Sequence, residues 1–289
     1  GVYLFDTQTG DAPRCLADGT SPAWRPGVAA MPGPLPTPNY RAPQAFETYT
    51  VTSTSPDGLW TAEAFDALPA SGGGISSDYY TRLTVARADG TAAWTLVDTW
   101  QRWGLGYLVP RPFHWSLDGR SLYFTNRPVP DGCPYFVNGS DLQRVDLQSG
   151  HVTQLAPALG FWLALSPDER TLAAGGSGRL TLRDLATGLE RELRLSPAEV
   201  YAPLGKIVWS PDGAALVLTV ANDPCSTRPR THSIVRVEAA TLAATTLLER
   251  DPRLFTSEAW PEARRVLLAD QGKGRWWLDP GSGELTCAE

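Results

Sequence analysis

Histidine is scarce in this sequence of 289 residues, which limits the metal and acid–base chemistry that it can support. The three histidines are His114, His151 and His232. We expect His114 and His232 to approach the same face, and His151, which follows a hairpin glycine, to be exposed. Two histidines without a matched third ligand are a weak indication of a metal site. The sequence has no HExxH, Cys-x-x-Cys or calcium-loop motif, so no metal and no cofactor are expected.

The sequence also lacks the usual motifs of nucleophilic catalysis and phosphate binding. It has no GxSxG, and its serines lie mostly in turns. The glycine-rich stretch SGGGISS at 71–77 is followed by neither a lysine nor a helix pattern, so it does not indicate a phosphate loop. These observations favour a non-catalytic protein. An enzyme of the glycosidase or lyase type stays open, because sequence alone does not place two carboxylates opposite each other.

Aromatic residues and arginines gather in the long connections between apolar segments. Aromatic rings with polar edges and arginines with fixed donors suit the recognition of a peptide, a sugar or a protein surface. The alternative for each ring is that it packs its loop onto the scaffold. We predict a ligand-binding face formed by Trp100, Trp103, Tyr107, Arg111, His114, Tyr79, Tyr80, Tyr135, Tyr201, Arg230 and His232.

A short turn motif recurs along the chain and indicates which elements position these connections. SPDG or a close variant occurs at 55–58, 116–119, 166–169 and 210–213, and degenerate copies of the motif occur at 24–27 and 260–270. Proline presets the turn, aspartate bonds the following amides, and glycine accepts the positive φ that ends it. Each turn lies between two apolar segments, so each unit is a hairpin.

A second hairpin follows each of the first kind, so one repeat contains four strands. These second hairpins lie at 83–97, 142–155, 180–195, 234–248 and 276–287, with a further copy at 2–16. The turn acids Asp57, Asp118, Asp168, Asp212 and Glu262 recur at intervals of 44 to 61 residues. We assign these acids a local role in their own turns rather than a metal-binding one. Four strands at this interval predict the blades of a β-propeller.

The repeats resemble those of TolB-type, WD40-like (PD40) β-propellers. The segments PAWRPG, WSPDG and HWSLDG carry the resemblance, each followed by an apolar strand and a D-x-x-T/S-G hairpin, and it covers nearly the whole chain. It implies an all-β propeller of four-stranded antiparallel blades. We expect six blades, one of them irregular, with five or seven as alternatives. The expected domain is a single one over 1–289, with an irregular proline-rich insertion at about 28–45.

Composition narrows the expected partners and location. A net charge of −6 and an isoelectric point near 5.2 argue against a nucleic-acid partner. No apolar run is long enough for a transmembrane segment. The chain opens on GVYLFDTQTG, with neither an initiator methionine nor a basic segment, so we expect a leader or anchor to have been removed. We therefore expect a monomer outside the cytoplasm: periplasmic, a surface lipoprotein or secreted.

Four cysteines permit two disulfides, which suits an oxidising compartment. Cys133 and Cys225 lie at matching places in the long connections of two repeats, and we expect them to pair. Cys15 and Cys287 lie at matching places in the first and last copies of the second hairpin, which predicts a second bridge where the ring closes. Free buried thiols are the alternative for all four.

Propeller geometry separates two faces. The SPDG bends fall on one face, and the long connections fall on the other, which we call the loop-rich face. Long ordered loops on a rigid scaffold usually carry function. We therefore expect a non-catalytic module that binds a protein, peptide or glycan through the loop-rich face, with a short peptide in the central channel as the favoured variant.

Two enzymatic alternatives follow from the resemblance. The chain can be the propeller of a prolyl-oligopeptidase-like peptidase separated from its hydrolase domain, or a TolB-like polysaccharide lyase or hydrolase. TolB itself carries a further N-terminal α/β domain that this sequence lacks, so its translocation function is not expected to transfer.

Overall fold

The computed structural model describes residues 2–4, 14–17, 46–69, 78–102, 108–128, 140–176, 178–195, 204–222, 231–270 and 274–288. The chain divides into two compact units, Gly1–Pro43 and Gln44–Glu289. In the first unit, β1 (Val2–Leu4) and β2 (Arg14–Ala17) form the antiparallel hairpin that the sequence predicted. The proline-rich stretch at about 28–45 lies outside the described residues, and a single domain over the whole chain stays a prediction.

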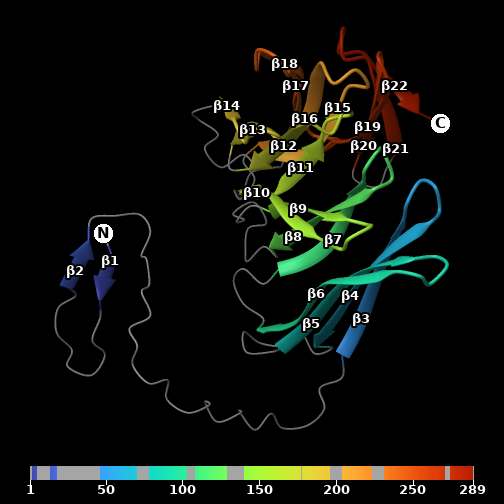
Figure 1. Ribbon diagram of the computed structural model, residues 1–289. Coiled ribbons are helices and arrows are strands. Elements are labelled where there is room, and N and C mark those ends of the chain that lie inside the picture. The colour runs from blue at the N-terminus through green and yellow to red at the C-terminus, as the bar shows by residue number, and fades with distance from the viewer. Residues whose placement is uncertain are drawn as a thin grey trace. The chain divides into compact units, whose positions relative to one another are not determined.

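The described part of the second unit consists of five four-stranded antiparallel sheets, which we name blades 1 to 5 (Figure 1). Blade 1 contains β3 (Phe46–Thr54), β4 (Trp60–Pro69), β5 (Asp78–Arg87) and β6 (Ala93–Arg102). Blade 2 contains β7 (Leu108–Trp115), β8 (Ser121–Pro128), β9 (Ser140–Asp146) and β10 (Val152–Gly160). Blade 3 contains β11 (Trp162–Leu165), β12 (Thr171–Gly176), β13 (Arg179–Asp184) and β14 (Glu190–Arg194). Blade 4 contains β15 (Leu204–Trp209), β16 (Ala215–Asn222), β17 (Thr231–Glu238) and β18 (Ala244–Asp251), and blade 5 contains β19 (Thr256–Glu262), β20 (Arg265–Asp270), β21 (Gly274–Leu278) and β22 (Leu285–Ala288).

This architecture confirms the predicted all-β fold of four-stranded propeller blades. In every blade the strands pair in chain order, as consecutive hairpins require. Each turn acid of the predicted repeat lies between the first and second strands of its blade, or ends the first strand as Glu262 does. A sixth blade that completes the ring stays a prediction.

The core lies between neighbouring blades, where buried apolar side chains of adjacent sheets meet. In β5, Tyr79, Thr81, Leu83 and Val85 are buried, while the residues between them are partly exposed. This period of two is typical of a strand in a layered sheet. One apolar cluster joins Ala64 and Leu83 of blade 1 to residues of blade 2, and further clusters join blade 2 to blade 3, blade 3 to blade 4, and blade 4 to blade 5. Each blade therefore depends on its neighbours for burial of its apolar faces.

A tryptophan before the turn motif ties two of the blades to the preceding blade. Trp115 Nε1 donates to Ser53 Oγ of blade 1 at 2.9 Å, and Trp209 Nε1 donates to the carbonyl oxygen of Ala164 in blade 3 at 3.2 Å. Both indoles are buried. Because a buried indole N–H needs an acceptor, these bonds also fix the register between adjacent first strands.

The turns have the local chemistry that the sequence predicted. In blade 4, Ser210 Oγ donates to Asp212 Oδ1 at 2.6 Å, and the backbone amide of Ala214 donates to the same oxygen at 3.0 Å. Gly213 has φ of 70°, which only glycine adopts without strain. The same serine–aspartate bond is present for Ser55 and Asp57, Ser116 and Asp118, and Ser166 and Asp168. These bonds keep the pKa of each of the four aspartates below its ordinary value of 3.8.

We expect the free energy of unfolding to fall as the pH drops below about 5. A carboxyl whose pKa is lower in the folded chain stabilises the fold fully above its unfolded pKa, and this contribution is lost as the pH falls through the folded pKa. Replacing Asp57, Asp118, Asp168 and Asp212 together by Asn preserves the turn shape but removes the titrating groups. Urea unfolding from neutral to acidic pH should therefore show a smaller pH-dependent loss in this variant, and an unchanged slope would contradict the prediction.

The expected bridge between Cys15 and Cys287 stays a prediction. Cys287 is an exposed thiol in β22 without a disulfide partner among the described side chains, and the side chain of Cys15 in β2 is not among them. Cys133 and Cys225 lie outside the described residues, so their pairing stays a prediction.

Candidate functional site

Much of the loop-rich face lies outside the described residues, but the strand ends that border it are described. Within the blades, the connections from second to third strands run through 70–77, 129–139 and 223–230. Of the predicted contact residues, Trp103, Tyr107, Tyr135, Tyr201 and Arg230 fall in undescribed segments. The other six have defined positions: Tyr79, Tyr80, Trp100, Arg111, His114 and His232.

Tyr79 is a core residue, which corrects its assignment as an exposed contact residue. Its side chain is 0% exposed. Its hydroxyl donates to the carbonyl oxygen of Leu108 in blade 2 and accepts a hydrogen bond from Gln101 Nε2 at 2.8 Å. The strand alternation that buries Tyr79 turns the next residue, Tyr80, toward the other side of the sheet. Tyr79 therefore joins blades 1 and 2.

Tyr80 and Trp100 form a surface aromatic cluster on blade 1, as expected of recognition residues. They pair across β5 and β6, with ring centroids 5.2 Å apart. Trp100 is 58% exposed, and Phe46 packs edge-on against it at 5.9 Å. Their role in ligand binding stays a prediction.

Arg111 forms an ion pair between blades rather than a free donor on the surface. Its guanidinium donates to Asp66 Oδ2 in β4, and the carboxylate of Asp66 is almost completely buried. Thr81 donates to the other carboxylate oxygen at 2.8 Å. A buried carboxylate needs such partners, so Arg111 is committed to the scaffold.

His114 and His232 lie at opposite ends of their strands, which corrects the expectation that they approach the same face. His114 stands next to the bend that ends β7, and its Nε2 is 2.8 Å from Glu169 Oε1 of the blade 3 bend. His232 stands near the start of β17, at the end of the loop connection, and its Nδ1 is 2.8 Å from the carbonyl oxygen of Phe255. The sequence did not reveal this difference, because it depends on strand direction.

Glu169 replaces the turn glycine of the other repeats and joins blades 2 and 3 on the bend face. Its φ is 59°, where Gly58, Gly119 and Gly213 have values of 71°, 68° and 70°. Its Oε1 accepts the backbone amide of Leu117 at 2.7 Å, in addition to the contact with His114. The inter-blade bonds offset the cost of a left-handed backbone at a residue with a side chain.

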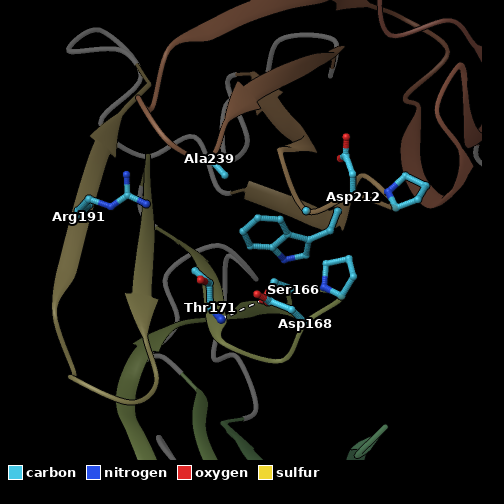
Figure 2. Close-up of a pocket in the computed structure, with 10 residues that line it drawn as sticks. Ser166, Asp168, Thr171, Arg191, Asp212 and Ala239 are labelled. Atoms are coloured by element: carbon cyan, nitrogen blue, oxygen red, sulfur yellow. Dashed lines mark hydrogen bonds between the residues drawn. The ribbon is translucent and has the colours of Figure 1, made fainter.

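A groove of about 310 Å³ lies on the bend face between blades 3 and 4 (Figure 2). Its walls include the two turns that contain Asp168 and Asp212, and Trp209 and Arg191 also line it. The two carboxylates are held in their own turns, the Trp209 indole donates to Ala164, and Arg191 Nη1 donates to the carbonyl oxygen of Ala240 at 2.7 Å. Since these carboxylates, the indole and the guanidinium already have partners within the protein, the groove offers few free hydrogen-bonding groups to a ligand.

A second cavity, which we call the inner pocket, lies among strands of blades 2, 3 and 4. Its volume is about 200 Å³. The residues that line it are Phe113, Thr125, Ser140, Phe161, Trp162, Leu163 and Lys206. Ser140 begins β9, Trp162 begins β11 and Lys206 is near the start of β15. These positions put the pocket toward the loop-rich ends of the strands, on the side where we expected function.

Three local features shape the inner pocket. The β7–β8 register shifts between Pro112 and His114, which frees Phe113 from the regular alternation. Ser140 shares a sheet face with Leu142, whose side chain packs in the cluster between blades 2 and 3. Gly160 lies so close to Gly175 of blade 3 that an added Cβ would stand 2.8 Å from the Gly175 carbonyl oxygen. Glycine at this position therefore permits the close approach that seats Phe161 and Trp162 beside blade 2.

Two polar side chains of the inner pocket, Ser140 and Lys206, lack hydrogen-bond or ionic partners among the described residues. Ser140 is 1% exposed, and its Oγ is the one buried hydroxyl within the described residues that lacks a hydrogen-bond partner. Leaving a buried hydroxyl unpaired costs about 1–3 kcal/mol, so it points to a partner outside the described residues. Lys206 is the only charged residue that lines the pocket, and it makes no ion pair within the described part of the chain.

The described residues of the inner pocket do not provide Ser140 with the partners of a catalytic serine. A nucleophilic serine needs a base within hydrogen-bond reach, and Ser140 Oγ has no such neighbour among the described residues. Nor does the described part of the chain contain a group of three or more His, Cys, Asp or Glu residues able to hold a metal ion. Aromatic walls with a hydroxyl and an ammonium can instead hold an apolar group that carries a polar head.

Sequence reasoning missed every residue of the inner pocket. One usable signal was Lys206, because the sequence has only one other lysine, Lys273. Another was the adjacent pair Phe161 and Trp162 at the start of an inner strand. Neither signal identified Ser140, whose isolation depends on which side chains surround it.

The fold and the inner pocket define this protein as a β-propeller with a small cavity along its inner strands, and comparisons with solved structures agree on the fold. A structure from an analysis of two prolyl endopeptidases has 14% identity and a TM-score of 0.53, covering 81% of this chain and 35% of that chain. Dipeptidyl peptidase 4 from Porphyromonas gingivalis has 12% identity and a TM-score of 0.50, covering 82% and 39%. TolB from Acinetobacter baumannii has 12% identity and a TM-score of 0.38, covering 82% and 62%.

These similarities concern the fold alone, because all three identities are low. The two matches with TM-scores of 0.53 and 0.50 support the fold and nothing finer. It spans between about a third and two fifths of the length of the two peptidase chains. No family model and no curated protein matches the sequence. Within the described residues, no helix has the length and apolar character needed to cross a membrane.

Proposed function

We propose that this protein is a non-catalytic binding module that holds part of a peptide, protein or glycan in the inner pocket. The observation that carries the proposal is the buried hydroxyl of Ser140, which has no partner among the described residues, in a cavity whose one charged residue within the described part of the chain is the exposed Lys206. A hydroxyl and a cation beside aromatic walls are typical of a site that fixes the orientation of a ligand. A short peptide is the favoured ligand.

The positions of the other charged candidates support this choice of site. Arg111 is committed to Asp66, and His232 to the carbonyl oxygen of Phe255. The inner pocket, in contrast, has polar groups without partners in the described chain. The surface cluster of Tyr80 and Trp100 then serves as a further contact for a larger ligand. We also propose a monomer outside the cytoplasm, a location supported by the even number of cysteines and by the resemblance to TolB-type repeats.

A second candidate function is that of a propeller domain in a larger peptidase. It is favoured by the peptidase structures with TM-scores of 0.53 and 0.50, of which this chain spans between about a third and two fifths. The discriminating observation is the coding sequence that continues beyond this chain: a serine hydrolase domain there would establish the second candidate.

The binding proposal is tested by screening short peptides and oligosaccharides against the full chain with ligand-observed NMR. Ligands of the inner pocket should lose about tenfold or more in affinity when Ser140→Ala and Lys206→Met are combined. Arg194→Met is the matched control, because that arginine side chain is 85% exposed and does not line the pocket. Ligands that bind the double variant as well as the unchanged protein would contradict the proposed site.

A further inference from the structure

We infer that the inner pocket binds a monocarboxylate with an apolar body of about one amino-acid residue. Two sources share this chemistry, the C-terminal residue of a peptide and a small free apolar acid. The inference rests on the proposed function and deepens it by naming the class of ligand. It follows from the charge, the hydroxyl donors and the size of the pocket.

The charge of the pocket selects an anion. Among the described residues that line the pocket, Lys206 is the one charged residue and none is a carboxylate. The nearest acid along the chain is Asp141, which accepts hydrogen bonds from the Asn126 amide at 2.8 Å and from Gln143 Nε2 at 2.8 Å. Asp141 is therefore occupied within blade 2. A cationic ligand would meet the ammonium of Lys206 without a compensating acid, whereas an anion would pair with it.

One ammonium matches one negative charge. A phosphate carries about 1.5 to 2 negative charges and three acceptor oxygens, and it usually requires a cluster of arginines. No arginine is among the described residues that line the inner pocket. A carboxylate carries one charge on two oxygens, so a single ammonium and a few neutral donors suffice.

Two buried hydroxyls supply those neutral donors. Ser140 is 1% exposed and Thr125 is 4% exposed, and both line the pocket. Each hydroxyl has one proton to donate. The Ser140 hydroxyl has no acceptor in the described protein, and a carboxylate oxygen would provide one. Charge-assisted bonds of this kind are about twice as strong as bonds between neutral groups.

The walls and volume set the size of the ligand body. Phe113, Phe161, Trp162 and Leu163 present apolar side chains, and Phe161 and Trp162 meet edge-on at 5.1 Å. The volume of about 200 Å³ is below the range of about 300–1,000 Å³ usual for drug-sized ligands. The pocket therefore has room for one apolar side chain and its carboxylate.

Titration calorimetry on the full chain tests this inference with matched ligands. The probes are N-acetyl-leucine, its amide, the cation leucinamide, and a tetrapeptide ending in leucine as the free acid and as the amide. We expect each acid to bind at least tenfold more tightly than its amide, with leucinamide weakest. Tight binding of the tetrapeptide acid would identify a peptide C-terminus as the source, and tight binding of N-acetyl-leucine alone would identify a small free acid.

Variants assign the preference to named groups. Lys206→Met should remove the preference for acid over amide, and Lys206→Glu should reverse it in favour of leucinamide. Ser140→Ala should weaken acid binding several-fold without removing the preference. Arg194→Met should change neither the affinity for the acids nor the preference for acid over amide. Urea unfolding of each variant provides the folding control. Misfolding would weaken the binding of every probe, so it would not explain a reversal of the preference by Lys206→Glu.

One result would contradict the carboxylate inference alone, and another would contradict the proposed function of the pocket. If the amides bind as tightly as the acids, or leucinamide binds best, the carboxylate inference is overturned while the binding site stands. If no probe binds the unchanged, folded protein at millimolar concentration, and the peptide and glycan screen also finds no ligand sensitive to Ser140 and Lys206, the proposed function of the pocket fails.

Discussion

Replacing Arg111 by methionine is expected to lower the free energy of unfolding by about 3–5 kcal/mol. The guanidinium of Arg111 is the ionic partner of Asp66, whose side chain is 5% exposed. Without it, the carboxylate keeps only the neutral Thr81 hydroxyl as a side-chain partner. A buried charge that loses its counterion is costly, because neither water nor another cation replaces it. The interface between blades 1 and 2 should weaken accordingly.

Urea unfolding of the single and double variants measures this effect. Combining Asp66→Leu with Arg111→Met removes both charges and should recover most of the lost stability. Arg194→Met, at an arginine side chain that is 85% exposed, should change stability by less than about 0.5 kcal/mol. If Arg111→Met leaves stability unchanged and instead weakens ligand binding, Arg111 is a contact residue as the sequence had suggested.

Replacing Tyr79 by alanine is expected to lower the free energy of unfolding by about 3–5 kcal/mol, as truncation of a large buried aromatic residue usually does. The ring is completely buried, and it lies where β5 packs against blade 2. Tyr79→Phe keeps the ring and removes only the hydroxyl. We expect it to cost about 1 kcal/mol, because Gln101 Nε2 still donates to the Leu108 carbonyl oxygen at 2.9 Å.

Trp100→Ala is the matched control, because Trp100 is an aromatic residue of the adjacent strand but is 58% exposed. Trp100→Ala should lower the free energy of unfolding by less than about 1 kcal/mol, because substitutions at surface positions usually have small effects. Chemical denaturation of the three variants gives the comparison directly. The prediction is wrong if Tyr79→Ala costs no more than Trp100→Ala, since that would place Tyr79 outside the core.

The blades could be predicted from the sequence because their determinants are local. Ser210 and Asp212 are two residues apart, and the bond between them shapes the bend wherever the motif occurs. Alternating apolar residues, such as those of β5, define a strand within a few positions. The repeat of these local signals predicted four strands per blade without any knowledge of which blades touch.

The residues of the candidate site could not be predicted in the same way. Arg111 and Asp66 are 45 positions apart, and His114 and Glu169 are 55 apart. Their pairing depends on how two blades pack, and no local pattern reports that distance. Strand alternation, which was visible in the sequence, showed that Tyr79 and Tyr80 face opposite ways but not which of the two faces is covered.

The sequence by itself determined the all-β class, the turn chemistry and the order of the blades, because hydrogen bonds within each turn and alternation within each strand involve near neighbours. Only the tertiary structure decided which polar groups have partners within the scaffold. Burial removes water from Asp66 and Ser140 alike, but Asp66 receives a partner from the neighbouring blade, and Ser140 has none among the described residues. That difference arises from the packing of distant segments, and it places the candidate site in the inner pocket.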